Sequence, residues 1–186
     1  YSSCVFIGTS AGLVNGSGSN NIAIGHGAMD DTDADTTVGG SLSNIFIGTN
    51  AGGGTWVTAA SNYNVGIGVN TMDAAMNGAL NNTALGYNTL SGLTTGDNNV
   101  VIGKGSGNAL TSGSSNVIIG TDTGVATIDT YYHVIIGSGA GAAGDIANHG
   151  QTIIGTAAGN ALTSGARITA VGYEALNDLT GGDDNL

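Results

Sequence analysis

Hydrophobic and polar positions alternate along this chain in a short unit that recurs about every 17 residues. Each unit carries three mostly apolar residues followed by glycine, as in VFIG, IFIG, VVIG and VIIG, and ten copies occur. Successive glycines of this kind are separated by 17 to 23 residues, and they stand at positions 8, 25, 48, 68, 86, 103, 120, 137, 155 and 172. A period of this length, carried by β-forming residues, predicts a stacked repeat in which every unit adds one coil.

The residue directly before each repeat glycine is a branched aliphatic in every copy, and the residue two places earlier is β-branched in every copy. Because alternate residues of a strand share a face, we expect these two positions to form one face of the strand. We assign that face to the interior of the coil. The predicted solenoid core therefore contains Ile7, Ile24, Ile47, Ile67, Leu85, Ile102, Ile119, Ile136, Ile154 and Val171.

The position between these two points to the opposite face of the strand, and it is also apolar or glycine in every copy. A strand with one solvated face alternates apolar and polar residues, whereas a strand buried on both faces is continuously apolar. A single solenoid offers nothing to cover the second face, so we expect further copies of the chain to cover it. The predicted interface between copies, which the resemblance described below implies to be a trimer interface, contains Phe6, Ala23, Phe46, Ala84, Val101, Ile118, Ile135, Ile153 and Ala170.

The remainder of the unit combines turn residues with a second apolar position. In the regular copies a leucine stands seven residues after the glycine, where we expect it to fill the other side of the coil. Asparagine directly precedes six of the strands, and two interpretations stay open: a hydrogen-bonded ladder along the stack, or separate residues that each terminate a turn. The leucines are Leu93, Leu110, Leu162 and Leu179, and the asparagines are Asn21, Asn44, Asn64, Asn82, Asn99 and Asn116.

These patterns predict an all-β fold, a parallel β-solenoid of about ten coils with a unit of about 17 residues. Residues 1–186 form one repeat array in this interpretation. The chain begins within a unit and stops where an eleventh strand would start, so we expect it to be part of a longer fibre. The two longest intervals between glycines predict insertion loops near residues 29–43 and 52–62.

Composition narrows the function classes. The chain has 35 glycines among 186 residues but no proline, which excludes a collagen-like helix. No apolar run approaches the ~18 residues of a membrane-spanning helix, so we expect no such span in this segment. The formal net charge is −11, with Lys104 and Arg167 as the only lysine and arginine. Nucleic-acid binding needs a basic surface, so this class of partner is excluded.

Two apparent catalytic motifs fall on the repeat itself. Gly8, Ser10 and Gly12 spell the G-x-S-x-G pattern of a hydrolase nucleophile, but other copies place GTNAG, GTDTG or GTAAG there. A G-x-G-x-x-G pattern starts at Gly139, yet the next apolar strand arrives within 18 residues, which leaves no room for a nucleotide-binding helix. We therefore expect no catalytic residue, no bound cofactor and no enzymatic activity.

The longest interval between repeat glycines holds an acidic loop. Asp31, Asp33 and Asp35 alternate there, and such spacing can gather oxygen ligands around Ca²⁺. The loop lacks the glycine and the terminal glutamate of an EF-hand, since Thr36 and Leu42 occupy those places. Two interpretations remain for these carboxylates: a calcium site or a solvated loop.

Several isolated residues carry alternative interpretations. His26, His133 and His149 lie in different units without metal-ligand spacing, which favours turn or surface positions. Exposed aromatic residues can bind sugars, and Trp56 and the pair Tyr131 and Tyr132 are candidates for contact with a glycan. For the tryptophan, packing over a corner of the coil is the other interpretation.

At the level of whole units the chain resembles known fibres. The stretch NNTALGYNTLSGLTTGDNNVVIGKGSGNALTSGSSNVIIG is similar to the N-T-A-I-G-Y-x-A-L repeats of bacteriophage tail fibres. It is more distantly similar to the head repeats of YadA-type trimeric autotransporter adhesins. The resemblance covers nearly the whole chain. It implies a left-handed parallel β-roll, in which three protomers pack side by side and the strand ending in I-G lines the interface.

Three functions follow as hypotheses. The first is a structural segment of a virion fibre, extracellular and homotrimeric, which presents surfaces that bind a glycan or protein of the host cell. The second is a bacterial adhesin of the trimeric autotransporter type, placed on the outer cell surface. The third is a β-helical enzyme that degrades polysaccharides, which requires paired carboxylates. Outside the acidic loop the acids are turn residues such as Asp97, Asp122 and Asp178.

Overall fold

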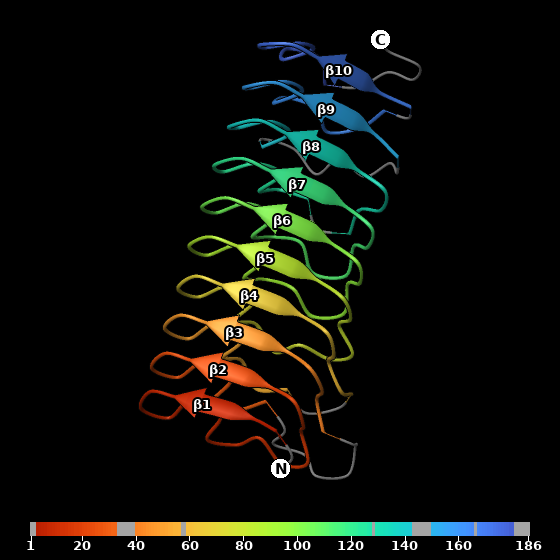
Figure 1. The fold of residues 1–186 in the computed structure, drawn as a ribbon. Coiled ribbons are helices and arrows are strands. Elements are labelled where there is room, and N and C mark those ends of the chain that lie inside the picture. The colour runs from red at the N-terminus through yellow and green to blue at the C-terminus, as the bar shows by residue number, and fades with distance from the viewer. Residues whose placement is uncertain are drawn as a thin grey trace.

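The computed structural model describes residues 3–32, 40–56, 59–127, 129–142, 150–165 and 167–180, and these residues form a parallel β-solenoid (Figure 1). Each of its ten strands has three residues and ends directly before a repeat glycine, which confirms the predicted strands. The strands are β1 (Val5–Ile7), β2 (Ile22–Ile24), β3 (Ile45–Ile47), β4 (Val65–Ile67), β5 (Thr83–Leu85), β6 (Val100–Ile102), β7 (Val117–Ile119), β8 (Val134–Ile136), β9 (Thr152–Ile154) and β10 (Thr169–Val171).

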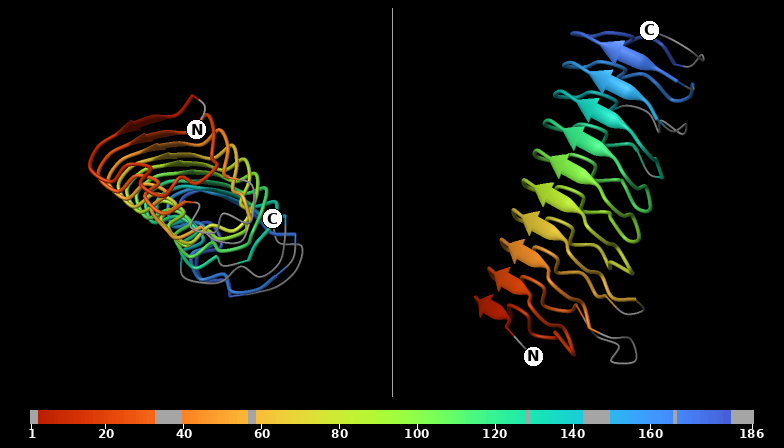
Figure 2. Two further views of the ribbon diagram at one scale, coloured as in Figure 1. Left: turned by 90° about the horizontal axis from the view of Figure 1, so that it is seen from below. Right: turned by 45° about the vertical axis from the view of Figure 1, so that its right-hand side comes forward.

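The strands form a single parallel sheet in chain order, so that each coil stacks on the one before it. Pairing is in register with the repeat: Val100 of β6 lies opposite Val117 of β7, and Val117 lies opposite Val134 of β8. At about 4.8 Å between neighbouring strands, ten strands span roughly 43 Å along the stack. Seen nearly end-on, the coils superimpose as a flattened loop, with all the strands on one wall (Figure 2).

The repeat glycines combine a positive φ with a close approach to the next coil. Their φ angles lie between 127° and 145°, a region that side chains rarely allow. A Cβ atom at Gly86 would also lie 2.8 Å from the carbonyl carbon and oxygen of Gly103 in the next coil. Any larger residue would therefore strain the backbone and push the coils apart. This double requirement explains why glycine ends every strand.

Three further positions in each coil have left-handed backbone conformation. They lie five residues before the repeat glycine and two and four residues after it, with φ between 47° and 75° in all ten copies. The turns orient successive N–H groups toward opposite neighbours: Asn88 donates to the Val69 carbonyl of the preceding coil, and Leu90 donates to the Ser106 carbonyl of the next. These positions could not be predicted from the sequence, because their occupants include Tyr63 and Glu174, which do not favour this conformation.

The interior of the solenoid is lined by the middle residue of each strand, which reverses the assignment made from the sequence. The nine residues predicted as interface point inward, and eight of them are fully buried within one chain, while Phe6 in the first coil is partly buried: Phe6, Ala23, Phe46, Ala84, Val101, Ile118, Ile135, Ile153 and Ala170. The ten residues predicted as core point outward, and none is buried: Ile7, Ile24, Ile47, Ile67, Leu85, Ile102, Ile119, Ile136, Ile154 and Val171. The prediction from the sequence was therefore wrong about which face of the strand is inside.

The sizes of the middle residues explain why this column, and not the residue before the glycine, lies inside. Phe46 and Gly66 are neighbours in the sheet, and the Phe46 ring occupies the space in which a side chain at Gly66 would lie. Trp56 packs edge-on against Phe46 with ring centroids 5.7 Å apart. An interior column can vary from glycine to phenylalanine because neighbouring side chains compensate in volume. The uniform columns before each glycine, by contrast, lie on the outer face.

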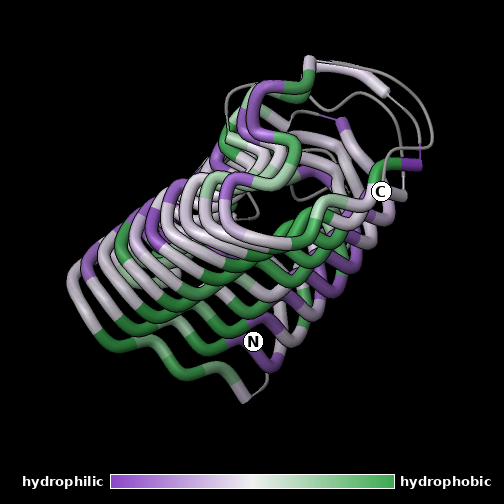
Figure 3. The backbone as a smooth tube through the Cα atoms, turned by 90° about the horizontal axis from the view of Figure 1, so that it is seen from above, coloured by the Kyte–Doolittle hydropathy of each residue, from purple (hydrophilic) through white to green (hydrophobic). Residues whose placement is uncertain are grey.

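The prediction for the leucine seven residues after the glycine is confirmed in three coils. Leu93, Leu110 and Leu162 are fully buried and fill the interior, while Leu179 in the last coil is partly buried. Met29 and Trp56, in the described parts of the two long intervals, are buried as well. Apolar segments of successive coils line up along one wall of the tube (Figure 3).

Candidate assembly surface

The outer face of the sheet is aliphatic. It consists of the residues three places and one place before each repeat glycine, which we call the aliphatic columns. These residues are branched aliphatics or threonine in all ten coils, and each one is partly or fully exposed. In the middle of the stack Ile67, Leu85 and Val100 expose 37%, 45% and 37% of their surface. A contiguous apolar face of this kind on a single chain is typical of a surface that binds another protein.

Two further columns border this aliphatic face, and they carry the aromatic and cationic residues. They lie five residues before the repeat glycine and one residue after it, and we call them the flanking columns. Four of the five described tyrosines lie there, all more than half exposed: Tyr63, Tyr87, Tyr132 and Tyr173. Lys104 and Arg167, the only lysine and arginine, lie there too.

No aspartate or glutamate occupies any of these four columns, although the chain has 13 acidic residues. Protein interfaces are enriched in tyrosine and arginine and depleted of acids, and this face has both properties. An acidic residue next to the face, Glu174, accepts a hydrogen bond from Tyr173, and this bond raises the pKa of the phenol. The acids of the chain thus lie outside the four columns.

Behind the outer face the asparagines form a continuous buried ladder, which settles the choice between the two interpretations. Each Nδ2 donates to the Oδ1 of the preceding rung, at 2.9 Å from Asn99 to Asn82 and 2.9 Å from Asn116 to Asn99. Each Oδ1 also accepts the backbone N–H of the following rung, as Asn82 does from Asn99 at 3.0 Å. The Nδ2 groups donate a second bond to a carbonyl of the next coil, such as Gly113 for Asn99. Every rung is buried and its amide is bonded on both sides.

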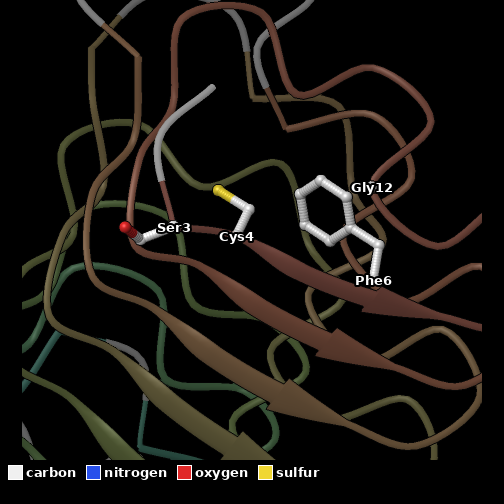
Figure 4. A pocket seen from close by; sticks show the side chains of 4 residues that line it. All are labelled: Ser3, Cys4, Phe6 and Gly12. Atoms are coloured by element: carbon white, nitrogen blue, oxygen red, sulfur yellow. The ribbon is translucent and has the colours of Figure 1, made fainter.

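The ladder changes composition at both ends of the stack. In the first coil Cys4 takes the rung position, and the side chain of the buried Asn15 accepts the Asn21 amide at 3.2 Å instead. Cys4 and Phe6 point to the same side of β1, beside Gly12, at a pocket where the first coil is open (Figure 4). Beyond the last asparagine the rung positions are occupied by His133, Gln151 and Ile168.

The predicted calcium ligands are only partly covered by the structure. Asp31 accepts a hydrogen bond from Thr55 at 2.6 Å, while Asp33 and Asp35 lie outside the described residues. No group of three or more His, Cys, Asp or Glu side chains that could hold a metal ion occurs among the residues that the structure describes. Within the same residues, His26 is exposed and His133 is buried.

The candidate sugar-binding aromatics differ in accessibility. Trp56 exposes only 2% of its surface, so it packs over the interior and offers no face to a glycan. Tyr132 exposes 67% and lies 6.5 Å from Tyr131, measured between ring centroids. Tyr132 is therefore accessible at the edge of the outer face, while Tyr131 is only partly exposed.

The serine of the G-x-S-x-G pattern occupies a turn position that every coil shares. Ser10 has a φ of 59°, as Asn50 and Asp122 have 53° and 50° at the equivalent place in their coils. Gly139 occupies this position in a later coil, two residues after its repeat glycine, and Gly141 occupies the left-handed position four residues after that glycine. The repeat geometry accounts for these residue types at these places.

Comparison of the chain with protein-family models, with curated proteins and with solved structures found no match in any of the three. The described residues contain no helix of the length and hydrophobicity needed to cross a membrane.

Proposed function

We propose that this chain is a structural segment of an extracellular fibre, in which three copies pack side by side through the outer faces of their sheets. The observation that supports the proposal is the outer face itself: two aliphatic columns that run through all ten coils, bordered by tyrosines and free of acids. Leaving such a face in water is unfavourable by about 25 cal/mol for each Å² of apolar surface. Contact with further copies would remove it from solvent.

The distribution of charge is compatible with this arrangement. Each chain carries a formal net charge of −11, and close packing of three copies would be opposed by repulsion if the acids faced one another. With the acid-free faces inward, the carboxylates point away from the common axis. Three such faces around an axis also let every copy contact two neighbours.

Because the repeats resemble those of bacteriophage tail fibres, we propose that the fibre belongs to a virion. In that setting the segment extends the fibre and presents surfaces that bind a glycan or protein of the host cell. Its role is mechanical and multivalent, with three equivalent surfaces displayed on one rod. No catalytic step is part of this proposal.

Light scattering on the purified chain tests the assembly. The wild-type protein is expected to have three times the mass of one chain at micromolar concentration. Ile119→Asp places a charge on the outer face and is expected to reduce the mass to that of one chain, with the β-sheet circular dichroism retained. Asn108→Asp is the matched control, because aspartate already occupies the equivalent place at Asp30 and Asp73, and it should leave the trimer intact.

Two outcomes would contradict the proposal. A wild-type protein that stays a monomer at micromolar concentration would show that the outer face does not bind other copies. A trimer that survives Ile119→Asp would show that assembly uses a different surface.

A further inference from the structure

The residue three places after each repeat glycine divides the coils into two groups. Four consecutive coils in the middle of the stack carry a hydroxyl there, and the other six carry alanine. The four hydroxyl side chains are fully buried within one chain, and we call them the turn hydroxyls: Thr71, Thr89, Ser106 and Thr123. The alanines are Ala11, Ala28, Ala51, Ala140, Ala158 and Ala175.

Each turn hydroxyl donates to the carbonyl of the repeat glycine in the next coil. The bond from Thr89 to Gly103 measures 2.6 Å. The equivalent bonds join Thr71 to Gly86, Ser106 to Gly120 and Thr123 to Gly137. Four successive boundaries between coils therefore carry a side-chain hydrogen bond in this column. Alanine has no donor in its side chain, so the column of bonds stops on both sides of the middle coils.

The turn hydroxyls lie in the tight turn that follows each strand. Thr89 stands between two residues with left-handed backbone, Asn88 and Leu90, whose φ angles are 55° and 51°. A Cβ atom at Gly86 would lie 2.8 Å from its Oγ1, so the hydroxyl also needs glycine at the end of the strand. The Gly103 carbonyl accepts the N–H of Ser106, in its own turn, at 3.3 Å as well. One carbonyl oxygen thus connects the turns of two coils.

The asparagine ladder and the turn hydroxyls lie at opposite ends of the same strands. Asn82 directly precedes β5 and donates to the Gly96 carbonyl of the next coil at 2.8 Å, while Thr89 follows the same strand. Strands β4 to β7 all have a side-chain bond to the next coil before and after the strand. Strands β2 and β3 have the asparagine bond, but Ala28 and Ala51 follow them. In these two columns, side chains tie the middle strands at both ends and the earlier strands at one.

We infer that the turn hydroxyls form a rail that locks the glycine turns of the five coils from Gly68 to Gly137, and that the same turn opens more readily where alanine replaces the hydroxyl. Contacts between neighbouring coils add along a stacked repeat, so four consecutive bonds reinforce one continuous stretch. Tyr87 and Lys104 directly follow repeat glycines within this stretch. The rail therefore holds the middle of their flanking column in a fixed position.

Hydrogen exchange of the full chain, followed by mass spectrometry, tests the rail. Thr89→Val removes the hydroxyl at nearly constant volume, and exchange in residues 86–107 is expected to become about two- to tenfold faster, as for the loss of one neutral hydrogen bond. Thr89→Ser keeps the hydroxyl, as Ser106 does in the next coil, and should retain the protection. Unchanged exchange in Thr89→Val would overturn the rail. Exchange in Thr89→Ser as fast as in Thr89→Val would assign the effect to the methyl group and would overturn it too.

Extending the rail into an alanine coil provides the converse test. Ala158→Ser adds a hydroxyl at the same place in the turn after β9, and it is expected to slow exchange in residues 155–162. Ala157→Ser is the matched control, because serine already occupies the equivalent place at Ser10, and it should leave exchange unchanged. If Ala158→Ser exchanges no more slowly than the wild-type protein, alanine does not weaken the turn and the inference is wrong. The turn hydroxyls bond within one chain, so each result has the same meaning in a monomer and in a trimer.

Discussion

The inner and outer columns of the same strands differ in the range of side chains that they contain. Ile118 is fully buried while its neighbour Ile119 is partly exposed, although both are isoleucines on one three-residue strand. Along the stack, the inner column ranges from glycine to phenylalanine, whereas the outer columns stay aliphatic or threonine throughout. The interior satisfies a volume requirement that several side chains share. The outer face instead repeats one shape, which is what a surface needs in order to bind copies of itself.

A charged residue should have different consequences on the inner and on the outer side of the strand. We expect the inner substitution to have the largest effect on stability. Ile118→Asp buries an unpaired carboxylate among apolar side chains, and it is expected to unfold the surrounding coils, because such burial costs several kcal/mol or more. The adjacent Ile119→Asp should stay folded. Circular dichroism and thermal melting of the two variants make the comparison. If the variant at position 119 unfolds as completely as the variant at position 118, the assignment of the faces is wrong.

Removal of one ladder rung should have the next largest effect. Asn99→Ala leaves the Gly113 carbonyl and the backbone N–H of Asn116 without the side-chain partner that each has in the wild-type protein, at roughly 1–3 kcal/mol for each group. We expect a loss of about 2–6 kcal/mol in the free energy of unfolding, measured in urea. Asn98→Ser is the control, since Asn98 is exposed and serine occupies the equivalent place at Ser115. Similar losses in both variants would show that the ladder adds no stability.

The shared volume of the interior can be tested with a pair of substitutions. Gly66→Val places a side chain into the Phe46 ring and is expected to cost about 1–3 kcal/mol. Phe46→Val opens a cavity and should also destabilise the protein. Because the two residues share one space, the double variant should be more stable than the sum of the single changes predicts. Strict additivity of the unfolding free energies would contradict the idea of compensating volumes.

The sequence was sufficient to locate all ten strands, because every strand ends before a glycine with positive φ, and in the first nine coils the glycine also lies against the next coil. It was not sufficient to orient them, since both faces of the strand are apolar and the period of two does not say which one is inside. A usable signal was present: Asn82 and Ala84 are two residues apart and so share a face, and the size variation from Phe46 to Gly66 marks an interior. The left-handed turns could not be predicted, because tertiary stacking imposes that conformation on residues such as Tyr63.

The smallest effect is expected at Asp73, which is half-buried between the interior and the surface. Burial raises the pKa of this carboxyl, although a hydrogen bond from its own backbone N–H lowers it in part. With the folded pKa above the unfolded value of 3.8, stability is highest below that pH and is lost as the pH rises through the folded pKa. Asp73→Asn should therefore stabilise the protein slightly at pH 7 and have no effect at pH 3. The urea midpoints at both pH values provide the measurement, and an unchanged midpoint at pH 7 would contradict the burial effect.

The central claim is that the middle residue of each strand points into the solenoid and that further copies of the chain cover the outer face. Thiol labelling at neighbouring positions tests it most directly, because the labelling rate reports whether each side chain is accessible to solvent. Single Ile118→Cys and Ile119→Cys variants are made with Cys4→Ser, each with and without Ile136→Asp to prevent assembly. The thiol at position 118 should react slowly in both backgrounds. The thiol at position 119 should react slowly in the assembled protein and rapidly in the monomer. Equal labelling of both positions in the monomer, or rapid labelling at position 119 in the assembled protein, would contradict the account.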